Sequence, residues 1–170
     1  MTSKSKSCDS AAKDRSTSLR IAAMSADQIG QEIAGIARLR IEIFSKYPYL
    51  YDGNLNYEMS YLRPYRESTR AIVVGAWDGD RLVGCATGTP ILDHDDDFSE
   101  ALRESRLDLS KVFYCAESVL LPAYRGRGVG HRFFDLREAH ARRLGFRWSA
   151  FCACCARTTT RTALKATDYW

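Results

Sequence analysis

Apolar residues near the N-terminus recur first at strand spacing and then at helical spacing. Residues 19–24 form a short apolar run that predicts a strand. Directly after it, Ser25-Ala-Asp-Gln28 has the S-x-x-Q form of a capping box, which begins a helix. Branched apolar residues then share one helical face, at Ile29, Ile33, Ile36 and Ile43. The pattern predicts an amphipathic helix that packs against a sheet or a second helix.

An aromatic segment comes next. Residues 46–53 combine aromatic side chains with proline and glycine and predict a loop. Three tyrosines then share one face of a helix predicted over residues 56–68: Tyr57, Tyr61 and Tyr65. This stripe either packs as an amphipathic face with its hydroxyls at the rim, or lines a substrate pocket. We expect residues 47–65 and the loop at 93–97 to face an acceptor substrate.

The second half of the chain alternates strands with a helix. Strand patterns cover residues 71–77, 81–87, 111–121 and 147–154. A D-G turn at Asp78-Gly-Asp80 joins the first two into a hairpin. A helical pattern over 131–144, ended by Gly145, separates the last two. This order predicts an α/β fold with a mixed sheet.

Length and composition indicate one globular domain. The 170 residues are 45% hydrophobic and 27% charged, which argues against disorder and against a fibrous repeat. We expect a flexible tail at 1–18, a domain at 19–155 and an atypical tail at 156–170. Apolar runs fall short of the ~20 residues of a spanning helix, and residues 1–18 lack the apolar segment of a secretory signal. A cytoplasmic location is therefore expected.

Charge and cysteine content restrict the possible ligands. The 25 Lys and Arg residues against 21 Asp and Glu residues suit an anionic ligand without requiring a nucleic acid. Without an export signal the cysteines are expected to be reduced and mostly buried: Cys8, Cys85, Cys115, Cys152, Cys154 and Cys155. The last three do not form two separated ligand pairs, so no zinc site is predicted. The acidic loop at 93–97 is expected to be solvated, with a bound cation as the alternative.

The segment with the clearest chemistry is Tyr124-Arg-Gly-Arg-Gly-Val-Gly130, between a predicted strand and a predicted helix. Its alternating glycines let the main chain approach a ligand without interference from Cβ atoms. The first free N–H groups of the helix, its dipole, and Arg125 and Arg127 favour an anion such as pyrophosphate. The turn has neither the lysine of a P-loop nor the G-x-G-x-x-G spacing of a dinucleotide-binding fold.

This turn resembles the acyl-CoA turn R-x-x-G-x-G of the GNAT (GCN5-related) N-acetyltransferases. The matching residues are Arg125, Gly128 and Gly130. In that family the turn follows a strand of the form E-x-x-V-x-P-x-x-R-G-x-G-x-G, and Glu117 and Pro122 stand at the same spacing. The resemblance covers residues 19–155 and implies the GNAT acyl-CoA N-acyltransferase fold, truncated after its fifth strand.

The resemblance implies acetyl-CoA as the acyl donor and no metal. The donor would lie between the strands at 112–121 and 147–154, its pantetheine arm pairing with the main chain of Val119 and Leu121. The residues implied in acetyl-CoA binding are Val119, Leu120, Leu121, Arg125, Gly126, Arg127, Gly128, Val129, Gly130 and His131. The implied reaction is direct attack on the thioester by an amine of a small molecule or peptide.

Glu117 is the catalytic residue that the resemblance implies. It lies five residues before Pro122 on the donor strand, where many family members have an acidic residue that takes the proton of the amine. The alternative is a structural glutamate that pairs with an arginine at the sheet edge.

Residues 156–170 depart from the family pattern. Family members continue with a helix and two strands, and the helix often carries the tyrosine that protonates the CoA thiolate. Tyr169 is the only tyrosine of this tail and does not align with that acid. A sheet that ended at 147–154 would expose an edge and favour a homodimer. If the codons of this tail are read one nucleotide earlier, they allow the sequence D-D-H-P-D-R-P-Q-G-Y-R-L-L, which is similar to family members. We therefore hypothesise a frameshift near Cys155. The nucleotide sequence tests this hypothesis.

Two other functions fit parts of the sequence. The atypical C-terminal tail favours a catalytically impaired CoA-binding remnant, which would bind CoA without turnover. A basic nucleic-acid-binding module would lose affinity steeply with salt and would be indifferent to CoA. The arginines that favour this module are Arg125, Arg127, Arg132, Arg137, Arg142 and Arg143.

Overall fold

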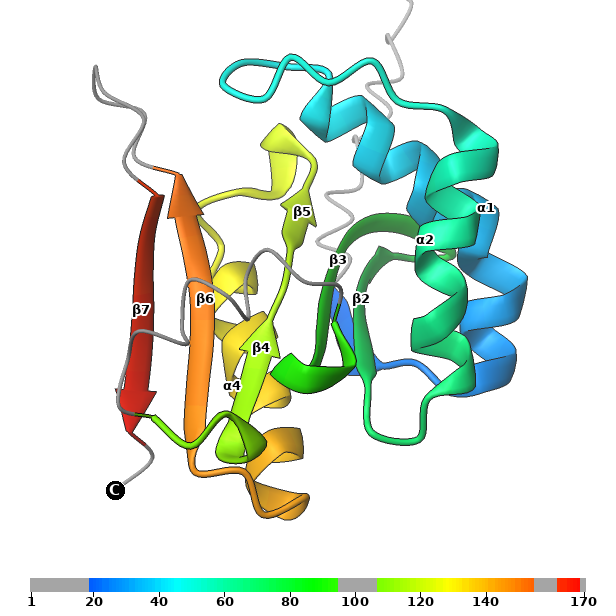
Figure 1. The fold of residues 1–170 in the computed structure, drawn as a ribbon. Helices are drawn as coiled ribbons and strands as arrows, with labels where there is room; N and C mark the ends of the chain where they lie inside the picture. Colours follow the sequence, from blue (N-terminus) through cyan, green and yellow to red (C-terminus); the bar gives the residue numbers. More distant parts are fainter. Residues whose placement is uncertain (1–18, 95–106, 155–161, 169–170) are drawn as a thin grey trace, which may run out of the picture.

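The computed structural model describes residues 19–94, 107–154 and 162–168, and shows a mixed sheet with helices on both faces (Figure 1). The strands are β1 (Arg20–Ala23), β2 (Ile72–Asp78), β3 (Arg81–Pro90), β4 (Val112–Cys115), β5 (Ser118–Leu120), β6 (Trp148–Cys154) and β7 (Thr162–Asp168). The helices are α1 (Ala26–Phe44), α2 (Leu55–Glu67) and α4 (Val129–Arg143), with short 3-10 turns η1 (Ile91–Asp93), η2 (Leu109–Lys111) and η3 (Pro122–Tyr124). The strand order is β1-β2-β3-β4-β6-β7, with β5 beside β3. The predicted α/β fold with a mixed sheet is confirmed.

Local sequence signals set the ends of several elements as predicted. The Ser25 hydroxyl accepts from the Gln28 N–H at 3.2 Å, and the Gln28 side chain accepts from the Ser25 N–H at 2.9 Å, which forms the predicted capping box. Asn54 caps α2 through the N–H groups of Asn56 and Tyr57. Gly79, with φ of +59°, makes the tight turn of the β2–β3 hairpin.

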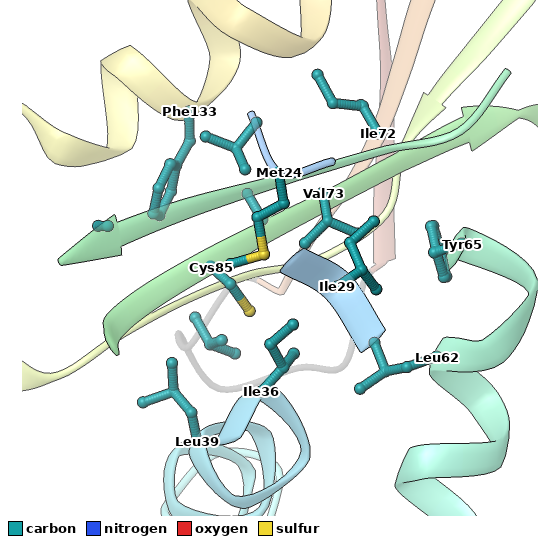
Figure 2. Close-up of a cluster of buried hydrophobic side chains, with 14 of the residues drawn as sticks. Met24, Ile29, Ile36, Leu39, Leu62, Tyr65, Ile72, Val73, Cys85 and Phe133 are labelled. Carbon is teal, nitrogen blue, oxygen red and sulfur yellow. The ribbon is translucent and has the colours of Figure 1, made fainter. Parts of the chain in front are cut away.

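The core lies on both faces of the sheet (Figure 2). Ile36 and Leu62 project from α1 and α2 onto one face, and Phe133 of α4 packs on the opposite face. Full burial of side chains of this size stabilises a fold by about 1.5–3 kcal/mol each. Cys85 shares this core, and burial raises the pKa of its thiol to about 12, so it stays protonated and unreactive.

The strand predicted over residues 111–121 is divided in two. β4 pairs with β6 in parallel and with the end of β3, whereas β5 pairs with β3. Ala116 and Glu117 form the interruption between them. The change of partner lets the chain turn away from β6, and the active-site geometry below follows from it.

The sheet extends one strand beyond the edge expected from the sequence. β7 pairs antiparallel with β6 over its whole length, from Thr162 opposite Cys154 to Asp168 opposite Trp148. Residues 157–170 contain several threonines, which are common in strands, but they have no continuous apolar face. Hydrophobic periodicity therefore did not predict a strand there. Residues 1–18, the acidic residues 95–97, residues 155–161 and Tyr169 lie outside the described residues.

Candidate active site

A cleft opens where the chain leaves β6. β4 pairs with β6 as far as Cys115 opposite Phe151, and β5 beyond it pairs with β3 instead. A cavity of about 690 Å³ lies at this divergence, between the sheet, α2 and α4. Its polar lining includes Tyr61, His94, Tyr114, Glu117, Ser118 and Arg137. The predicted gap between the two parallel strands is therefore present.

The glycine turn lies directly before α4. Gly126 and Gly128 have φ of +73° and +76°, values that glycine adopts without strain. Gly128 is the N-cap of α4 and contributes no side-chain cap, so the first N–H groups of the helix lack the usual side-chain acceptor. Arg125 and Arg127 are exposed beside the turn. The glycine turn and the helix start that the sequence predicts are therefore present, and a helix N-terminus of this kind suits an anion.

The main-chain register of β5 shows which of its groups bond to β3. The Leu121 N–H donates to the Val83 carbonyl at 2.9 Å, and Val119 lies opposite Cys85 in the same ladder. Because main-chain groups alternate in direction along a strand, residues 119 and 121 face β3. Ser118 and Leu120 instead direct their N–H and C=O groups away from β3, and the Leu120 carbonyl accepts from Arg125 Nε at 3.3 Å. The main-chain groups of Val119 and Leu121, which were predicted to contact pantetheine, are therefore directed towards β3 in this structure.

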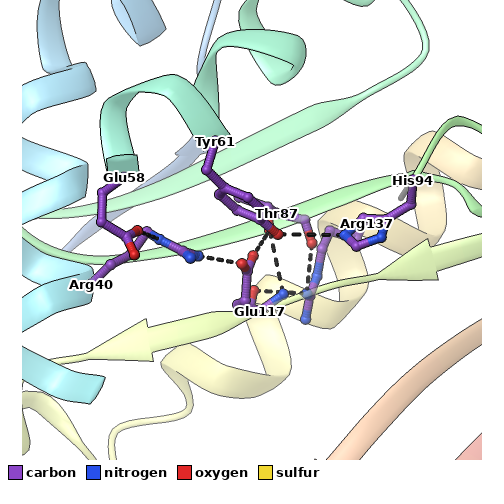
Figure 3. Close-up of polar contacts among 7 residues, drawn as sticks. All are labelled: Arg40, Glu58, Tyr61, Thr87, His94, Glu117 and Arg137. Atoms are coloured by element: carbon purple, nitrogen blue, oxygen red, sulfur yellow. Dashed lines mark hydrogen bonds and ion pairs between the residues drawn. The ribbon is translucent and has the colours of Figure 1, made fainter. Parts of the chain in front are cut away.

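Glu117 lies in the interruption between β4 and β5, where its carboxylate has three neighbours (Figure 3). Arg40 of α1 forms an ion pair with it, and the Thr87 hydroxyl of β3 donates to it. The Tyr61 hydroxyl is its third hydrogen-bond partner. Arg40 is 6% exposed and also contacts the buried Glu58 carboxylate at 2.5 Å. Two carboxylates thus share one buried guanidinium.

These contacts decide the protonation state of Glu117. Burial opposes its charge, but Arg40 and the hydrogen bonds from Thr87 and Tyr61 outweigh burial and lower the pKa of the carboxyl below its ordinary 4.5. A carboxylate held in this way is a weak proton acceptor at neutral pH. Its surroundings therefore favour the alternative interpretation, a structural glutamate paired with an arginine.

Tyr61, His94 and Tyr114 form a second polar group on the cleft wall, which the sequence did not single out. His94 Nε2 lies 3.4 Å from the Tyr61 hydroxyl oxygen, and the His94 ring packs edge-on against Tyr114 with centroids 4.9 Å apart. Burial, followed by the charge of Glu117, raises the pKa of both tyrosines. The loop at 93–97 was expected to face the acceptor, but no spacing distinguished its histidine.

The tyrosine stripe of α2 lines a second cavity of about 450 Å³. Tyr57 is 61% exposed at its mouth, whereas Tyr65 is 5% exposed in its wall. Tyr61 and His94 line both this cavity and the cleft, so they stand between the two spaces. Tyr65 also belongs to the buried core and Tyr61 packs against it, so the stripe both packs and lines this cavity.

The sequence model of the acetyltransferase (GNAT) family matches residues 33–161, more than half of the chain. The chain belongs to this family. A comparison with curated protein sequences gave no match.

Solved structures share the fold of this GNAT protein at low sequence identity. A GNAT family acetyltransferase from Brucella melitensis in complex with acetyl-CoA is 16% identical, with a TM-score of 0.60 over 91% of this chain and 90% of that chain. The aminoglycoside N-acetyltransferase AAC(6')-Iy in complex with CoA is 17% identical, with a TM-score of 0.60 over 81% and 78%. YncA from Salmonella typhimurium, solved with acetyl-CoA, is 12% identical, with a TM-score of 0.57 over 79% and 69%. Matches at these identities establish the fold.

Arg137 of α4 contributes to the GNAT fold from inside the protein. It is 1% exposed and donates to the carbonyls of Thr87 at 3.0 Å and Glu117 at 3.2 Å, and to the Ser118 hydroxyl at 3.0 Å. It is therefore absent from the basic surface that a nucleic-acid-binding module would use.

Within the described ranges, no helix could cross a membrane, and no three His, Cys, Asp or Glu side chains are grouped as a metal site.

Glu117→Gln is expected to lower stability in a pH-dependent way. Because the folded-state pKa of Glu117 is depressed, its ion pair stabilises the protein above the unfolded-state pKa and is lost as pH falls through the folded-state value. Urea unfolding should show a deficit of about 1.5–3 kcal/mol at pH 7 that shrinks below about pH 4.5. A deficit that stays constant from pH 7 to pH 3.5 would contradict the ion-pair role.

Proposed function

We propose that this GNAT protein transfers the acetyl group of acetyl-CoA to an amine of a small molecule or peptide. The observation that carries the proposal is the divergence of β5 from β6 directly before the glycine turn that begins α4. The main-chain groups of β5 that face away from β3 offer contacts for an amide-containing arm. The helix N-terminus, which has no side-chain cap, offers contacts for a phosphate group. Acetyl-CoA contains both.

Main-chain groups would make most of the donor contacts. The outward N–H and C=O groups of Ser118 and Leu120 suit the pantetheine arm, and the amides of residues 126–131 suit the pyrophosphate. Arg125 and Arg127 add positive charge at the turn. The solved Brucella and Salmonella proteins contain acetyl-CoA, which supports the same donor here.

The chemistry is direct acyl transfer. A neutral amine attacks the thioester carbonyl carbon, a C–N bond forms, the C–S bond breaks, and the thiolate takes up the proton that the nitrogen loses. The Ser118 N–H, which faces away from β3, would stabilise the negative charge that develops on the thioester oxygen, and the Ser118 C=O and Leu120 N–H would then hold the pantetheine arm.

The acceptor would reach the cleft along α2. The cavity lined by Tyr57, Tyr61 and Tyr65 adjoins the cleft and is mostly apolar, which suits an amine carried on an aromatic or other apolar group. The aminoglycoside N-acetyltransferase AAC(6')-Iy shares the fold, and this supports an amine as the class of acceptor.

An amine panel tests the function. The purified chain is incubated with acetyl-CoA and, in turn, an arylethylamine, a polyamine, an aminoglycoside and a lysine-containing peptide. Free thiol is measured by a colorimetric reagent, and the product is identified by a mass increase of one acetyl group. CoA binding without thiol release from any amine would favour the non-catalytic CoA-binding protein, and indifference to CoA would reject the proposal.

Gly130→Ala is expected to weaken CoA binding without destabilising the fold. Among the described atoms, a Cβ at Gly130 would meet none within 4 Å, and alanine in a helix is favoured over glycine by about 1 kcal/mol. The Tm should stay equal or rise, while the Kd for CoA measured by calorimetry should rise at least about fivefold, a cost of about 1 kcal/mol. Gly35→Ala, in α1 and away from the cleft, is the matched control. Unchanged CoA affinity in Gly130→Ala would contradict the pyrophosphate position.

A further inference from the structure

We propose that the protein binds a small phosphate compound in a cavity at the far end of α4 from the glycine turn. This cavity, of about 290 Å³, is lined by β1, the start of α1, the end of α2, the start of β2 and the second half of α4. These segments lie together at one end of the sheet (Figure 1). α4 has 15 residues, a length of about 22 Å, so one phosphate group cannot occupy both this cavity and the glycine turn.

The charged side chains that line this basic cavity are cationic. Arg66 of α2 and Arg143 of α4 both contribute to it, and none of the described residues that line it is acidic. The ion pairs of the described residues involve neither of these arginines. Guanidinium groups bind phosphate through parallel N–H···O bonds, and two of them match the charge of a dianion. The cavity therefore suits a phosphate group.

A glycine of α1 makes room for Arg66. A Cβ atom at position 30 would lie 3.0 Å from both Cζ and Nε of Arg66, so the guanidinium lies in the space that a larger residue than Gly30 would fill. Arg66 nevertheless remains exposed to solvent. Its charge is thus held between α1 and α2, where a ligand can still reach it.

His140 holds Arg143 from the side of α4. A carbonyl oxygen only accepts, so Nε2 of His140 donates to the Arg70 carbonyl at 3.0 Å. A guanidinium only donates, so Nδ1 accepts from Arg143 at 2.8 Å. Burial and the charge of Arg143 lower the pKa of His140 below its ordinary 6.5, which agrees with a neutral imidazole. The contact uses one N–H group of Arg143 and leaves others for a ligand.

Ser68, which follows α2, adds a hydroxyl donor. Its oxygen accepts from the N–H groups of Arg70 and Ala71, both at 3.1 Å. The remaining hydrogen-bonding capacity of the hydroxyl is its own O–H, which can donate to a phosphate oxygen. Arg70 supplies no further charge, because its guanidinium contacts both carboxylate oxygens of Asp93, at 2.5 and 2.7 Å.

The apolar part of the lining limits what the phosphate group can be attached to. Met24, Ile29 and Ile72 belong to the core and also line the basic cavity (Figure 2). Small-molecule sites usually enclose about 300–1,000 Å³, and this cavity is at the lower end of that range. A phosphate ester with a short apolar group fits this space better than a nucleotide does.

The basic cavity adjoins the tyrosine cavity, since Tyr65, Ser68 and Ala71 line both. The phosphate group therefore has two possible sources: a separate small molecule, or the distal end of the amine acceptor. Only the second source rests on the proposed function.

Calorimetric titration of the CoA-saturated protein with inorganic phosphate and with phenyl phosphate tests the site. Excess CoA competes for the glycine turn, so phosphate bound there is not counted. Because both arginines are exposed, we expect a Kd of about 1 mM for inorganic phosphate. The Kd for phenyl phosphate should be at least about threefold lower, because its ring covers apolar side chains.

Arg66→Gln and Arg143→Gln assign this binding to the basic cavity. Each should raise the Kd for phenyl phosphate at least about fivefold, because each removes one guanidinium from the ligand. The matched controls are Arg63→Gln and Arg142→Gln, which remove the same charge from the same two helices outside the lining. The controls should change the Kd less than about twofold, because salt screens exposed charges.

Three results would overturn the proposal. The first is no binding of phenyl phosphate at up to about 20 mM. The second is binding that excess CoA abolishes, which would place the phosphate at the glycine turn. The third is an equal effect of the controls, which would indicate general attraction to a basic surface. A protein that binds phenyl phosphate as expected but releases no thiol with any amine keeps this inference and rejects acetyl transfer.

The KM values of an arylethylamine and of its ring phosphate ester distinguish the two sources. If the phosphate group belongs to the acceptor, the ester should have the lower KM, and Arg66→Gln should remove the difference. Equal KM values together with the binding expected above assign the cavity to a separate phosphate compound.

Discussion

Arg40→Met is expected to lower the free energy of unfolding by about 3–5 kcal/mol at pH 7, because it leaves two carboxylates without their shared cation. Glu58 is 1% exposed, and Glu117 is 20% exposed at its side chain. Neither can be rehydrated fully in the folded state, so each retains much of its desolvation cost. Urea denaturation followed by circular dichroism measures the loss.

Two comparison variants make this prediction specific. Arg38→Met, on the exposed side of the same helix, should change stability by less than about 0.5 kcal/mol. Arg40→Met combined with Glu58→Gln and Glu117→Gln should be more stable than Arg40→Met alone, because the unpaired charges are gone. If the triple variant were less stable than the single one, the loss would come from packing of the Arg40 side chain and the electrostatic account would be wrong.

The elements that the sequence predicted well are those whose signal is local. The capping box at Ser25, the Asp-Gly hairpin turn and the glycine turn before α4 each depend on residues within a few positions of one another. Local hydrogen bonds and positive φ angles set these features whatever the rest of the chain does. For this reason the glycine turn and the start of the helix after it could be predicted before any tertiary structure was known.

Features that depend on distant residues could not be predicted in the same way. The phase of β5 depends on a one-residue shift in the pairing with β3, where both Ala116 and Glu117 bond to Thr87, and this shift directs the main-chain groups of Ser118 and Leu120 away from β3. The apolar run of residues 111–121 gives no sign of that shift. The partners of Glu117 lie 77 and 30 residues away in Arg40 and Thr87, so its role depended on packing.

The surroundings of His94 in the sequence differ from its surroundings in the folded protein. Its neighbours in sequence are acidic and suggested a solvated loop, whereas its neighbours in space are tyrosines from α2 and β4. His94 lies at the wall of the cleft because η1 turns the chain directly after β3. A residue of this kind is identified by the cavities it lines, which no periodicity records.

Arg137→Met is expected to weaken both the fold and donor binding. Its guanidinium bonds the carbonyls of Thr87 and Glu117 and the Ser118 hydroxyl, and so joins β3 to the chain between β4 and β5 where that chain departs from β6. Hydrogen bonds to a charged group contribute about 1.5–3 kcal/mol, and burial lowers the pKa of Arg137, which shows that desolvation offsets part of this gain. We therefore expect a loss of about 2–4 kcal/mol in the free energy of unfolding.

Donor affinity separates this role of Arg137 from a general contribution to stability. Without the guanidinium, the chain before β5 keeps its main-chain bonds to β3, including Thr87 N–H to the Glu117 carbonyl at 3.0 Å, and the bond from the Thr87 hydroxyl to the Glu117 carboxylate. Ser118 then loses its fixed orientation, and the Kd for CoA should rise about tenfold at a temperature where the variant is still folded. Arg142→Met, an exposed change on the same helix, should alter neither quantity by more than about 0.5 kcal/mol. Arg137→Met with reduced stability but wild-type CoA affinity would mean that the orientation of Ser118 is set by the strand alone.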